Sequence, residues 1–312
     1  MRLAALDLGS NSFHALIADV VRGGGLAVIE RAKRMPRIGE AIFRSGRFSG
    51  ATLEGALQAV GELVPVIERN EPEAVLAVAT SAVREARNGH AFVAKVRSRF
   101  GIDVQVISGD EEARLAYAGA RAQMGGSLGR ATLFDLGGGS LEVVVGDGSR
   151  ILHTASAPLG VLRALAEQPW SDPFSPLDLR TLERWARNRV AALLRPFQRL
   201  DLGEVVFCAG TARALRSVAR ALHLVPASGE GSNCLSRDTL QLLIEQLAAL
   251  PLAVRRDVPG MKPERADQIV HGAVILASVL DIVDVPRARV CRAALREGML
   301  LEHARRQWSA AA

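Results

Sequence analysis

Two thirteen-residue stretches decide the fold: DLGSNSFHALIAD at residues 7–19 and DLGGGSLEVVVGD at residues 135–147. A shift of 128 positions places Asp7 on Asp135 and keeps the apolar and small residues in register. Each stretch has the pattern of a buried strand end, a tight turn and a second apolar strand. Asp and Gly are common in unrelated turns, but the register shared by both flanking strands favours a duplicated hairpin. The sequence therefore predicts two similar α/β domains.

The rest of the chain predicts alternating helices and strands. The expected helices are 52–69, 90–99, 109–123, 177–200, 211–222 and 296–308, and the expected further strands are 26–34, 74–80, 103–108, 204–210 and 288–292. A glycine-rich break, MGGSLGR, covers residues 124–130. We place the first domain at 1–122 and the second at 123–295, and we expect the closing segment 296–312 to pack back onto the first.

Composition excludes several classes of protein. The chain has 312 residues, 49% hydrophobic and 23% charged, which is typical of a globular protein and excludes a disordered or collagen-like chain. No apolar run reaches the roughly 18 residues of a membrane span, so no membrane partner is expected. Three cysteines, few and odd in number, indicate a reducing compartment, and we expect a cytoplasmic protein.

The basic residues point to an anionic partner. The net charge is +6, and only three of the 39 basic residues are lysine. The planar fork of arginine matches phosphate oxygens, although a general composition bias explains the excess equally well. Aromatic residues make up only 4%, so the stacking side chains of a single-strand nucleic-acid surface are scarce, and no nucleic acid is expected.

The two hairpin turns carry the residues of a phosphate and metal site. In each turn an aspartate, Asp7 or Asp135, ends a buried strand and small residues follow. Small residues let a phosphate approach backbone N–H groups closely, and successive N–H groups form an anion-binding concavity. Mg²⁺ is commonly shared between carboxylates and phosphate oxygens. The pattern predicts such a site in a cleft between the two domains.

Further motifs carry a resemblance to a known family. The chain resembles the exopolyphosphatase and guanosine pentaphosphate phosphohydrolase (Ppx/GppA) family, in its short two-domain form. The motifs run in order through nearly the whole chain. They are the two hairpin stretches, TSAVREARNG (80–89), ISGDEEARLAYAG (107–119), AGTARAL (209–215), PERADQIVHGAVIL (263–276) and ALREGML (294–300).

The resemblance implies a fold and an activity. The fold is a pair of ribonuclease-H-like domains around a central cleft, as in the superfamily of actin, sugar kinases and heat-shock ATPases. The activity is release of the terminal phosphate from inorganic polyphosphate, with Mg²⁺ or Mn²⁺ as cofactor, and a homodimer is possible. Guanosine pentaphosphate hydrolysis is the first alternative. A polyphosphate sensor without activity and an ATP-dependent kinase are the others.

The resemblance also assigns roles at the start of the helix expected over 109–123. Ser108 and Glu111 fit a capping box, which would commit Glu111 to the helix end. Glu112 matches the general base of the family, a role in which a carboxylate takes a proton from the attacking water. From the residues alone, Glu112 would only favour the positive end of the helix dipole. Arg84 matches a phosphate-binding arginine that we count with the catalytic residues.

The remaining expected site residues come from the turns. Asp135 and Glu142 match metal-associated carboxylates, and Asp7 is a metal candidate that could instead cap its own turn. Arg213, Arg216 and Arg220 could guide an anionic chain, although a solvated helix face is the favoured interpretation. Leu141 and His271 depart from the family pattern. The expected phosphate contacts come from Ser10, Asn11, Gly138, Gly139, Ser140, Gly210 and Thr211.

Overall fold

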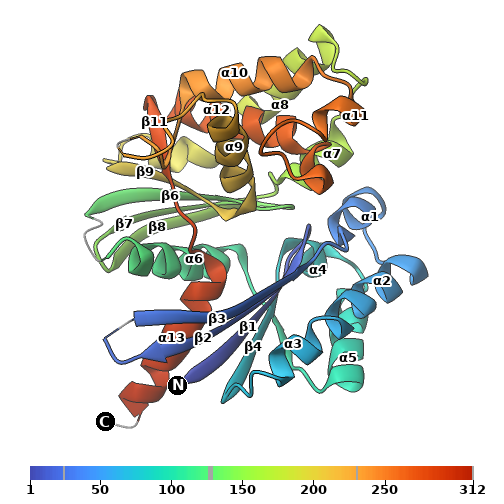
Figure 1. Cartoon of the computed structure of the whole chain (residues 1–312), viewed down its shortest axis with the longest axis vertical. Coiled ribbons are helices and arrows are strands. Elements are labelled where there is room, and N and C mark those ends of the chain that lie inside the picture. The colour runs from blue at the N-terminus through green and yellow to red at the C-terminus, as the bar shows by residue number, and fades with distance from the viewer. Residues whose placement is uncertain (24, 126–128, 230, 311–312) are drawn as a thin grey trace. The chain divides into compact units, whose positions relative to one another are not determined.

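The computed structural model describes the whole chain except residues 24, 126–128, 230 and 311–312 (Figure 1). It forms two compact units, residues 1–127 with 293–312 and residues 128–292, called unit 1 and unit 2 below. The divisions predicted from the sequence lie a few residues away, after 122 and after 295. Part of the glycine-rich break, 126–128, lies outside the described residues.

Unit 1 contains a mixed five-stranded sheet in the order β3-β2-β1-β4-β5. The strands β1, β2 and β3 form an antiparallel meander, whereas β4 and β5 join parallel to β1. The bounds are β1 (Arg2–Leu8), β2 (Phe13–Val21), β3 (Gly25–Arg34), β4 (Ala74–Ala79) and β5 (Val104–Val106).

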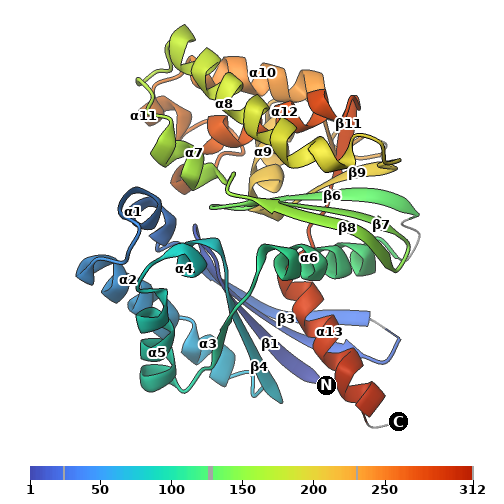
Figure 2. The same ribbon diagram turned by 180° about the vertical axis from the view of Figure 1, so that it is seen from behind.

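Alternate residues of β1 face two separate cores, as expected for a strand with both faces covered. Leu6 and Leu8 belong to a core with the helices α1 to α5, whereas Leu3 and Ala5 pack with α6 and α13. Figures 1 and 2 show α6 and α13 side by side on one face of the sheet. The helices are α1 (Ile38–Ser45), α2 (Gly50–Gly61), α3 (Val64–Glu68), α4 (Ser81–Glu85), α5 (Gly89–Phe100), α6 (Gly109–Gln123) and α13 (Leu295–Ala310).

Unit 2 repeats this topology. Its sheet has the order β10-β11-β9-β6-β7-β8, so β8-β7-β6-β9-β11 corresponds to β3-β2-β1-β4-β5 and β10 is an added antiparallel strand. The predicted duplicated, ribonuclease-H-like fold is confirmed by this repeat. The bounds are β6 (Arg130–Leu136), β7 (Leu141–Asp147), β8 (Arg150–Ala157), β9 (Glu204–Cys208), β10 (Cys234–Ser236) and β11 (Arg287–Val290).

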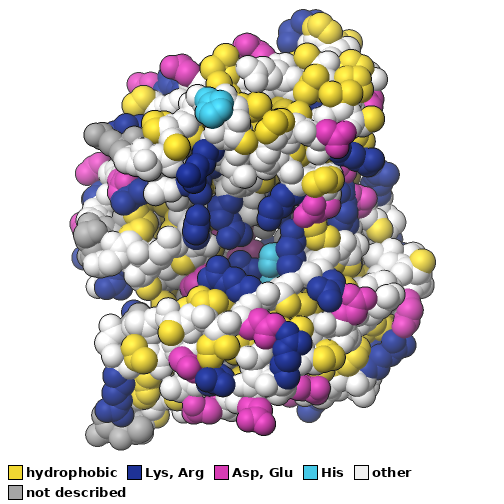
Figure 3. Space-filling model, viewed as in Figure 1, with side chains coloured by type: hydrophobic (Ala, Val, Ile, Leu, Met, Phe, Trp, Pro, Cys, Tyr) yellow, Lys and Arg dark blue, Asp and Glu magenta, His cyan; other side chains and the backbone are white. Residues whose placement is uncertain are grey.

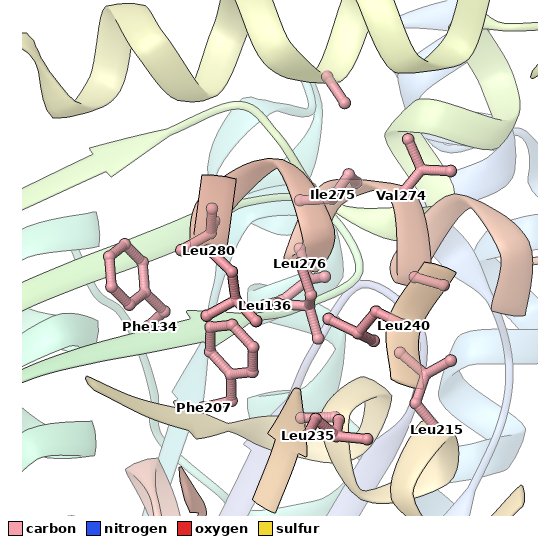
Figure 4. Packing of buried hydrophobic residues seen from close by; sticks show 14 of the residues in the cluster. Phe134, Leu136, Phe207, Leu215, Leu235, Leu240, Val274, Ile275, Leu276 and Leu280 are labelled. Atoms are coloured by element: carbon pink, nitrogen blue, oxygen red, sulfur yellow. The ribbon is translucent and has the colours of Figure 1, made fainter. Parts of the chain in front are cut away.

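Helices cover one face of the unit 2 sheet around an apolar core. Phe134 and Phe207 from the strands point toward Leu276 and Leu280 of α12 (Figure 4). The helices are α7 (Val161–Glu167), α8 (Pro176–Leu194), α9 (Ala209–Ala221), α10 (Arg237–Ala248), α11 (Leu252–Arg255) and α12 (Ile269–Ile282). No helix in the described part of the chain has both the length and the apolar character needed to cross a bilayer.

Several predicted elements differ from those observed. The helix expected over 52–69 is split into α2 and α3, because Pro65 cannot lie inside a helix and instead occupies its first turn. The strand expected over 103–108 is shorter, and α9 begins two residues before the expected 211. The helices α1, α4 and α7 and the strands β8 and β10 were not predicted.

Candidate active site

The first hairpin turn of unit 1 is tied to two helices. The Ser10 hydroxyl oxygen accepts the N–H of Ala82 at 3.1 Å, and the Ser10 carbonyl accepts the N–H of Gly39 at 2.9 Å. The Asn11 carbonyl accepts the N–H of Arg37 at 3.3 Å. The turn is therefore fixed against the starts of α1 and α4. The Ser10 oxygen accepts this bond from α4, so its hydroxyl hydrogen remains available to donate to an anionic ligand.

Glu112 and Arg84, two of the expected site residues, are brought together. The Arg84 Nη1 atom lies 3.6 Å from Glu112 Oε2 and donates a hydrogen bond to the Ile107 carbonyl at 2.7 Å. The Glu112 side chain is 13% exposed. Ile107 lies just before Ser108, the N-cap of α6, so the same connection that starts the helix also holds the arginine beside the carboxylate. Glu112 also lies in the first turn of α6, where the helix dipole favours a negative charge.

The predicted capping box is only half formed. Ser108 Oγ accepts the N–H of Glu111 at 3.1 Å, but Glu111 makes no return bond to Ser108 among the described residues. The prediction that Glu111 is committed to the helix end is therefore wrong. A single bond from Ser108 suffices to cap this end. Glu111 and Glu112 thus differ in their contacts, because only Glu112 meets Arg84.

Asp7 is the last but one residue of β1 and pairs across the hairpin with His14. Burial raises the pKa of the Asp7 carboxyl to about 6, an effect that Arg296 opposes and Glu297 reinforces. No described residue donates a hydrogen bond to this carboxylate, so the alternative role of capping its turn receives no support. The His14 Nε2 atom lies 2.8 Å from Ser12 Oγ, which gives the histidine a local partner.

Unit 2 places two acidic residues in the same cross-strand position. Asp135 of β6 pairs with Glu142 of β7, as Asp7 pairs with His14. Asp135 is 8% exposed and Glu142 only 1%. Ser156 of β8, which the sequence analysis missed, donates a hydrogen bond to Glu142 Oε1 at 2.9 Å.

These two carboxylates fit a divalent cation. Carboxylate oxygens are the ligands that Mg²⁺ prefers, and it commonly uses one or two of them beside water and substrate phosphates. Within the described residues, no group of three or more acidic, histidine or cysteine side chains is arranged to hold a metal. Asp135 and Glu142 would therefore hold such an ion only together with water or phosphate oxygens.

The glycine turn after β6 presents its carbonyls to α7. The Gly137 and Gly138 carbonyls accept the N–H groups of Val161 and Leu162, and the Gly139 carbonyl accepts Arg163 Nε at 3.0 Å. In a trans peptide the N–H group points opposite to the carbonyl. The next three N–H groups along the turn therefore point away from α7, as in an anion-binding nest. They belong to Gly138, Gly139 and Ser140, the residues expected to contact phosphate.

The start of α9 is closely packed against neighbouring side chains. A Cβ atom on Gly210 would lie 2.5 Å from Arg265 Nη2, and one on Gly272 would lie 2.4 Å from Thr211 Cγ2. Gly210 and Thr211 lie in the first turn of α9, which begins at Ala209, rather than in a preceding loop. Arg265 is buried. Its charge and the helix start both favour an anion, and only its place in the PERADQI motif could have signalled it.

The residue before Gly210 has an unusual backbone. Ala209 has a φ of +67°, in the left-handed region that favours glycine. The strand β9 ends at Cys208, so this one residue turns the chain directly into α9. Burial raises the pKa of the Cys208 thiol well above its ordinary value, and the nearby Cys291 thiol and Asp135 carboxylate add to the effect. Cys208 is therefore an inert thiol in the core.

Comparison with known proteins decides the family. The model of the Ppx/GppA phosphatase family matches residues 16–307. The chain belongs to the Ppx/GppA phosphatase family. Exopolyphosphatase 1 of Mycobacterium leprae is 31% identical over 303 residues, which cover 96% of this chain and 89% of that protein. A putative exopolyphosphatase of Haemophilus influenzae is 28% identical over 96% of this chain and 90% of that protein.

Solved structures of the Ppx/GppA family share the fold. An exopolyphosphatase from Cytophaga hutchinsonii superposes with a TM-score of 0.87 at 24% identity, covering 97% of this chain and 98% of that one. The Aquifex aeolicus Ppx/GppA family member gives a TM-score of 0.79 at 25% identity, covering 98% of both chains. The chain therefore shares its overall fold with these solved structures.

The expected site residues form two groups, one in each unit. Unit 1 holds Asp7, Ser10, Asn11, Arg84 and Glu112. Unit 2 holds Asp135, Gly138, Gly139, Ser140, Glu142, Gly210 and Thr211. Two arginines, Arg163 and Arg265, and Ser156 join the second group through their contacts.

Proposed function

We propose that this chain is an exopolyphosphatase that releases orthophosphate from the end of inorganic polyphosphate. The observation that carries the proposal is the buried Asp135–Glu142 pair beside three consecutive N–H groups that point away from α7. Such a site is suited to a phosphate chain and its cation. Curated relatives named exopolyphosphatase, at 31% identity, support the choice of substrate.

The residues divide the reaction between them. Glu112 accepts a proton as water attacks the terminal phosphorus, the bond from that phosphorus to the bridging oxygen breaks, and orthophosphate leaves. Arg84 and the glycine turn hold the phosphates and stabilise their charge. A bound Mg²⁺ or Mn²⁺ would neutralise charge on the phosphate oxygens, held by Asp135 and Glu142. Because phosphoryl transfer depends mainly on positioning and charge stabilisation, an ordinary carboxylate suffices as the base.

The mechanism requires the groups of unit 1 and unit 2 to act on one substrate, and this joint action is part of the proposal. Asp7 is the third proposed metal-associated carboxylate. The free cysteines of the chain agree with a reducing, cytoplasmic setting, which we also propose. The homodimer stays a prediction from family resemblance.

The first test is phosphate release from medium-length polyphosphate with Mg²⁺. Glu112→Gln and Glu112→Ala should each lose at least about a hundredfold in kcat, the usual size of a general-base effect, while still binding polyphosphate. Glu111→Gln is the matched control, because it removes a neighbouring carboxylate of the same helix turn that has no contact with Arg84. It should stay within about threefold of the wild type.

The outcomes separate the alternatives. Loss in the Glu112 variants alone supports the mechanism. Equal loss in the Glu111 and Glu112 variants would show that only the charge of the helix end matters. A wild type that hydrolyses guanosine pentaphosphate but not polyphosphate would replace the proposed substrate and keep the machinery. Binding of polyphosphate without release of phosphate from either compound would indicate a sensor.

A further inference from the structure

Arg216 of α9 is a partly buried arginine whose charge is not neutralised by a described carboxylate. Its Nη1 atom donates to the Ser232 carbonyl at 3.2 Å and to the Asn233 side-chain oxygen. Both acceptors are neutral, and Arg216 forms no ion pair with any residue that the structure describes. The two bonds fix the direction of the guanidinium, so its orientation does not depend on a carboxylate.

Two more arginines act on this position. Arg220 lies one turn further along α9, and Arg292 follows β11 after one residue. Burial lowers the pKa of Arg216, and the charges of Arg292 and Arg220 lower it further. Several arginines elsewhere meet carboxylates instead, as Arg99 meets Glu54 at 2.7 Å. The fold thus gathers positive charges that repel one another here, and a bound anion would offset this repulsion.

The arginines form a row that starts at the candidate site. Residues 213, 216 and 220 are spaced three and four apart, so their side chains share one face of α9. Arg213 is the first, and its Nε atom donates to the Ala209 carbonyl at 3.2 Å. From Gly210 to Arg220 the helix rises about 15 Å. Figure 3 shows Lys and Arg side chains gathered over the region of α9 and β11.

We propose that Arg213, Arg216, Arg220 and Arg292 bind the part of a linear polyphosphate chain that follows its reacting end. This inference rests on the proposed function and assigns the substrate a direction along α9. Neighbouring side chains on a helix face are about 5–6 Å apart at Cβ, a spacing that suits a repeating anion rather than one phosphate group. Each guanidinium fork can pair with phosphate oxygens. The row favours long chains over a short, nucleoside-linked phosphate.

The test compares chain lengths in a matched pair of variants. Arg216→Gln with Arg220→Gln removes two charges from the row. Arg184→Gln with Arg187→Gln removes two charges from exposed positions of α8 in the same unit and serves as the control. The ratio of kcat/KM on long polyphosphate to kcat/KM on triphosphate should fall about tenfold in the α9 variant, the scale of electrostatic capture. The control should keep the wild-type ratio.

Direct binding makes the result independent of turnover. The Kd for long polyphosphate, measured in the Glu112→Gln background, should rise about tenfold with the α9 changes and lose part of its salt dependence, because fewer counterions are displaced. Equal kcat/KM ratios and equal Kd values in the α9 and α8 variants would overturn the proposal that the row binds the polyphosphate chain. A wild type without hydrolysis of any polyphosphate refutes the proposed function instead, and the Kd comparison then still decides about the row.

Discussion

Asp135 and Glu142 show how one residue changes the chemistry of a duplicated hairpin. Both hairpins place an aspartate opposite the second residue of the following strand. In unit 1 that residue is His14, with Ser12 as its local partner. In unit 2 it is Glu142, with Ser156 as its donor. The exchange of a histidine for a glutamate leaves a pair of carboxylates in one copy only, so the two turns cannot serve the same role.

His271 gives a pH dependence to unit 2. It is fully buried, with its ring 5.5 Å from that of Phe174, and burial lowers its pKa to about 4. The unfolded chain binds the proton near pH 6.5 and the folded chain only near pH 4. The free energy of unfolding should therefore keep its full value above pH 6.5. It should fall by about 3 kcal/mol as the pH decreases to 4.

Urea unfolding followed by tryptophan fluorescence at pH 4 to 7.5 measures this loss. Trp170 lies close to His271, with ring centres 6.4 Å apart, so the signal reports on the right region. His271→Leu should flatten the pH profile, whereas His153→Gln, an exposed histidine of the same unit, should not. Parallel profiles for the wild type and His271→Leu would assign the pH dependence to other groups. His271 is in either case a core residue.

At the scale of elements, the sequence predicted most of the long and periodic parts and missed several elements without a clear apolar pattern. The two hairpins, α6 and α13 were predicted because their apolar patterns run over seven or more residues. The strand β10 has only three residues, and β8 has eight residues but no buried position, so neither shows an apolar pattern of its own. Contacts such as that of Arg163 with the Gly139 carbonyl, or of Arg265 with Gly210, depend on tertiary packing and leave no local signal.

The junction of β9 and α9 should gain stability from a glycine. Ala209 holds a left-handed backbone that costs a non-glycine residue about 1–2 kcal/mol. Ala209→Gly removes this cost, and part of the gain is offset by the greater freedom of glycine in the unfolded chain. We expect the free energy of unfolding of unit 2 to rise by about 1 kcal/mol. Thermal unfolding and urea titration measure it.

A second alanine of the same helix provides the control. Ala214 lies inside α9 with ordinary helical backbone, so Ala214→Gly should lower the free energy of unfolding by about 1 kcal/mol. If Ala209→Gly raises the free energy of unfolding and Ala214→Gly lowers it, the backbone strain lies at the junction. If Ala209→Gly is also destabilising, the left-handed turn costs less than the entropy that glycine adds.

At the scale of the whole molecule, the chain leaves unit 1 at the end of α6 and returns to it in α13. Each unit has its own core, and unit 1 is completed only by the last segment. The helices α6 and α13 meet at two glycines. A Cβ atom on Gly119 would lie 2.1 Å from the Ala294 carbonyl oxygen, and one on Gly298 would lie 1.8 Å from that of Leu115. This close packing fixes the helix whose first turn carries Glu112.

Disturbing this contact should therefore unfold part of unit 1 and leave unit 2 intact. A Gly298→Val side chain cannot fit against the Leu115 backbone, so we expect a loss of several kcal/mol, the size of severe overpacking in a core. Hydrogen exchange followed by mass spectrometry should show faster exchange in β1, β2 and α6, while β6, β7 and α12 keep their protection. Gly55→Ala is the control, because no atom lies within 4 Å of its added Cβ. Faster exchange in both units would mean that they unfold as one, and Glu112 would then depend on the stability of the entire chain rather than on its own unit.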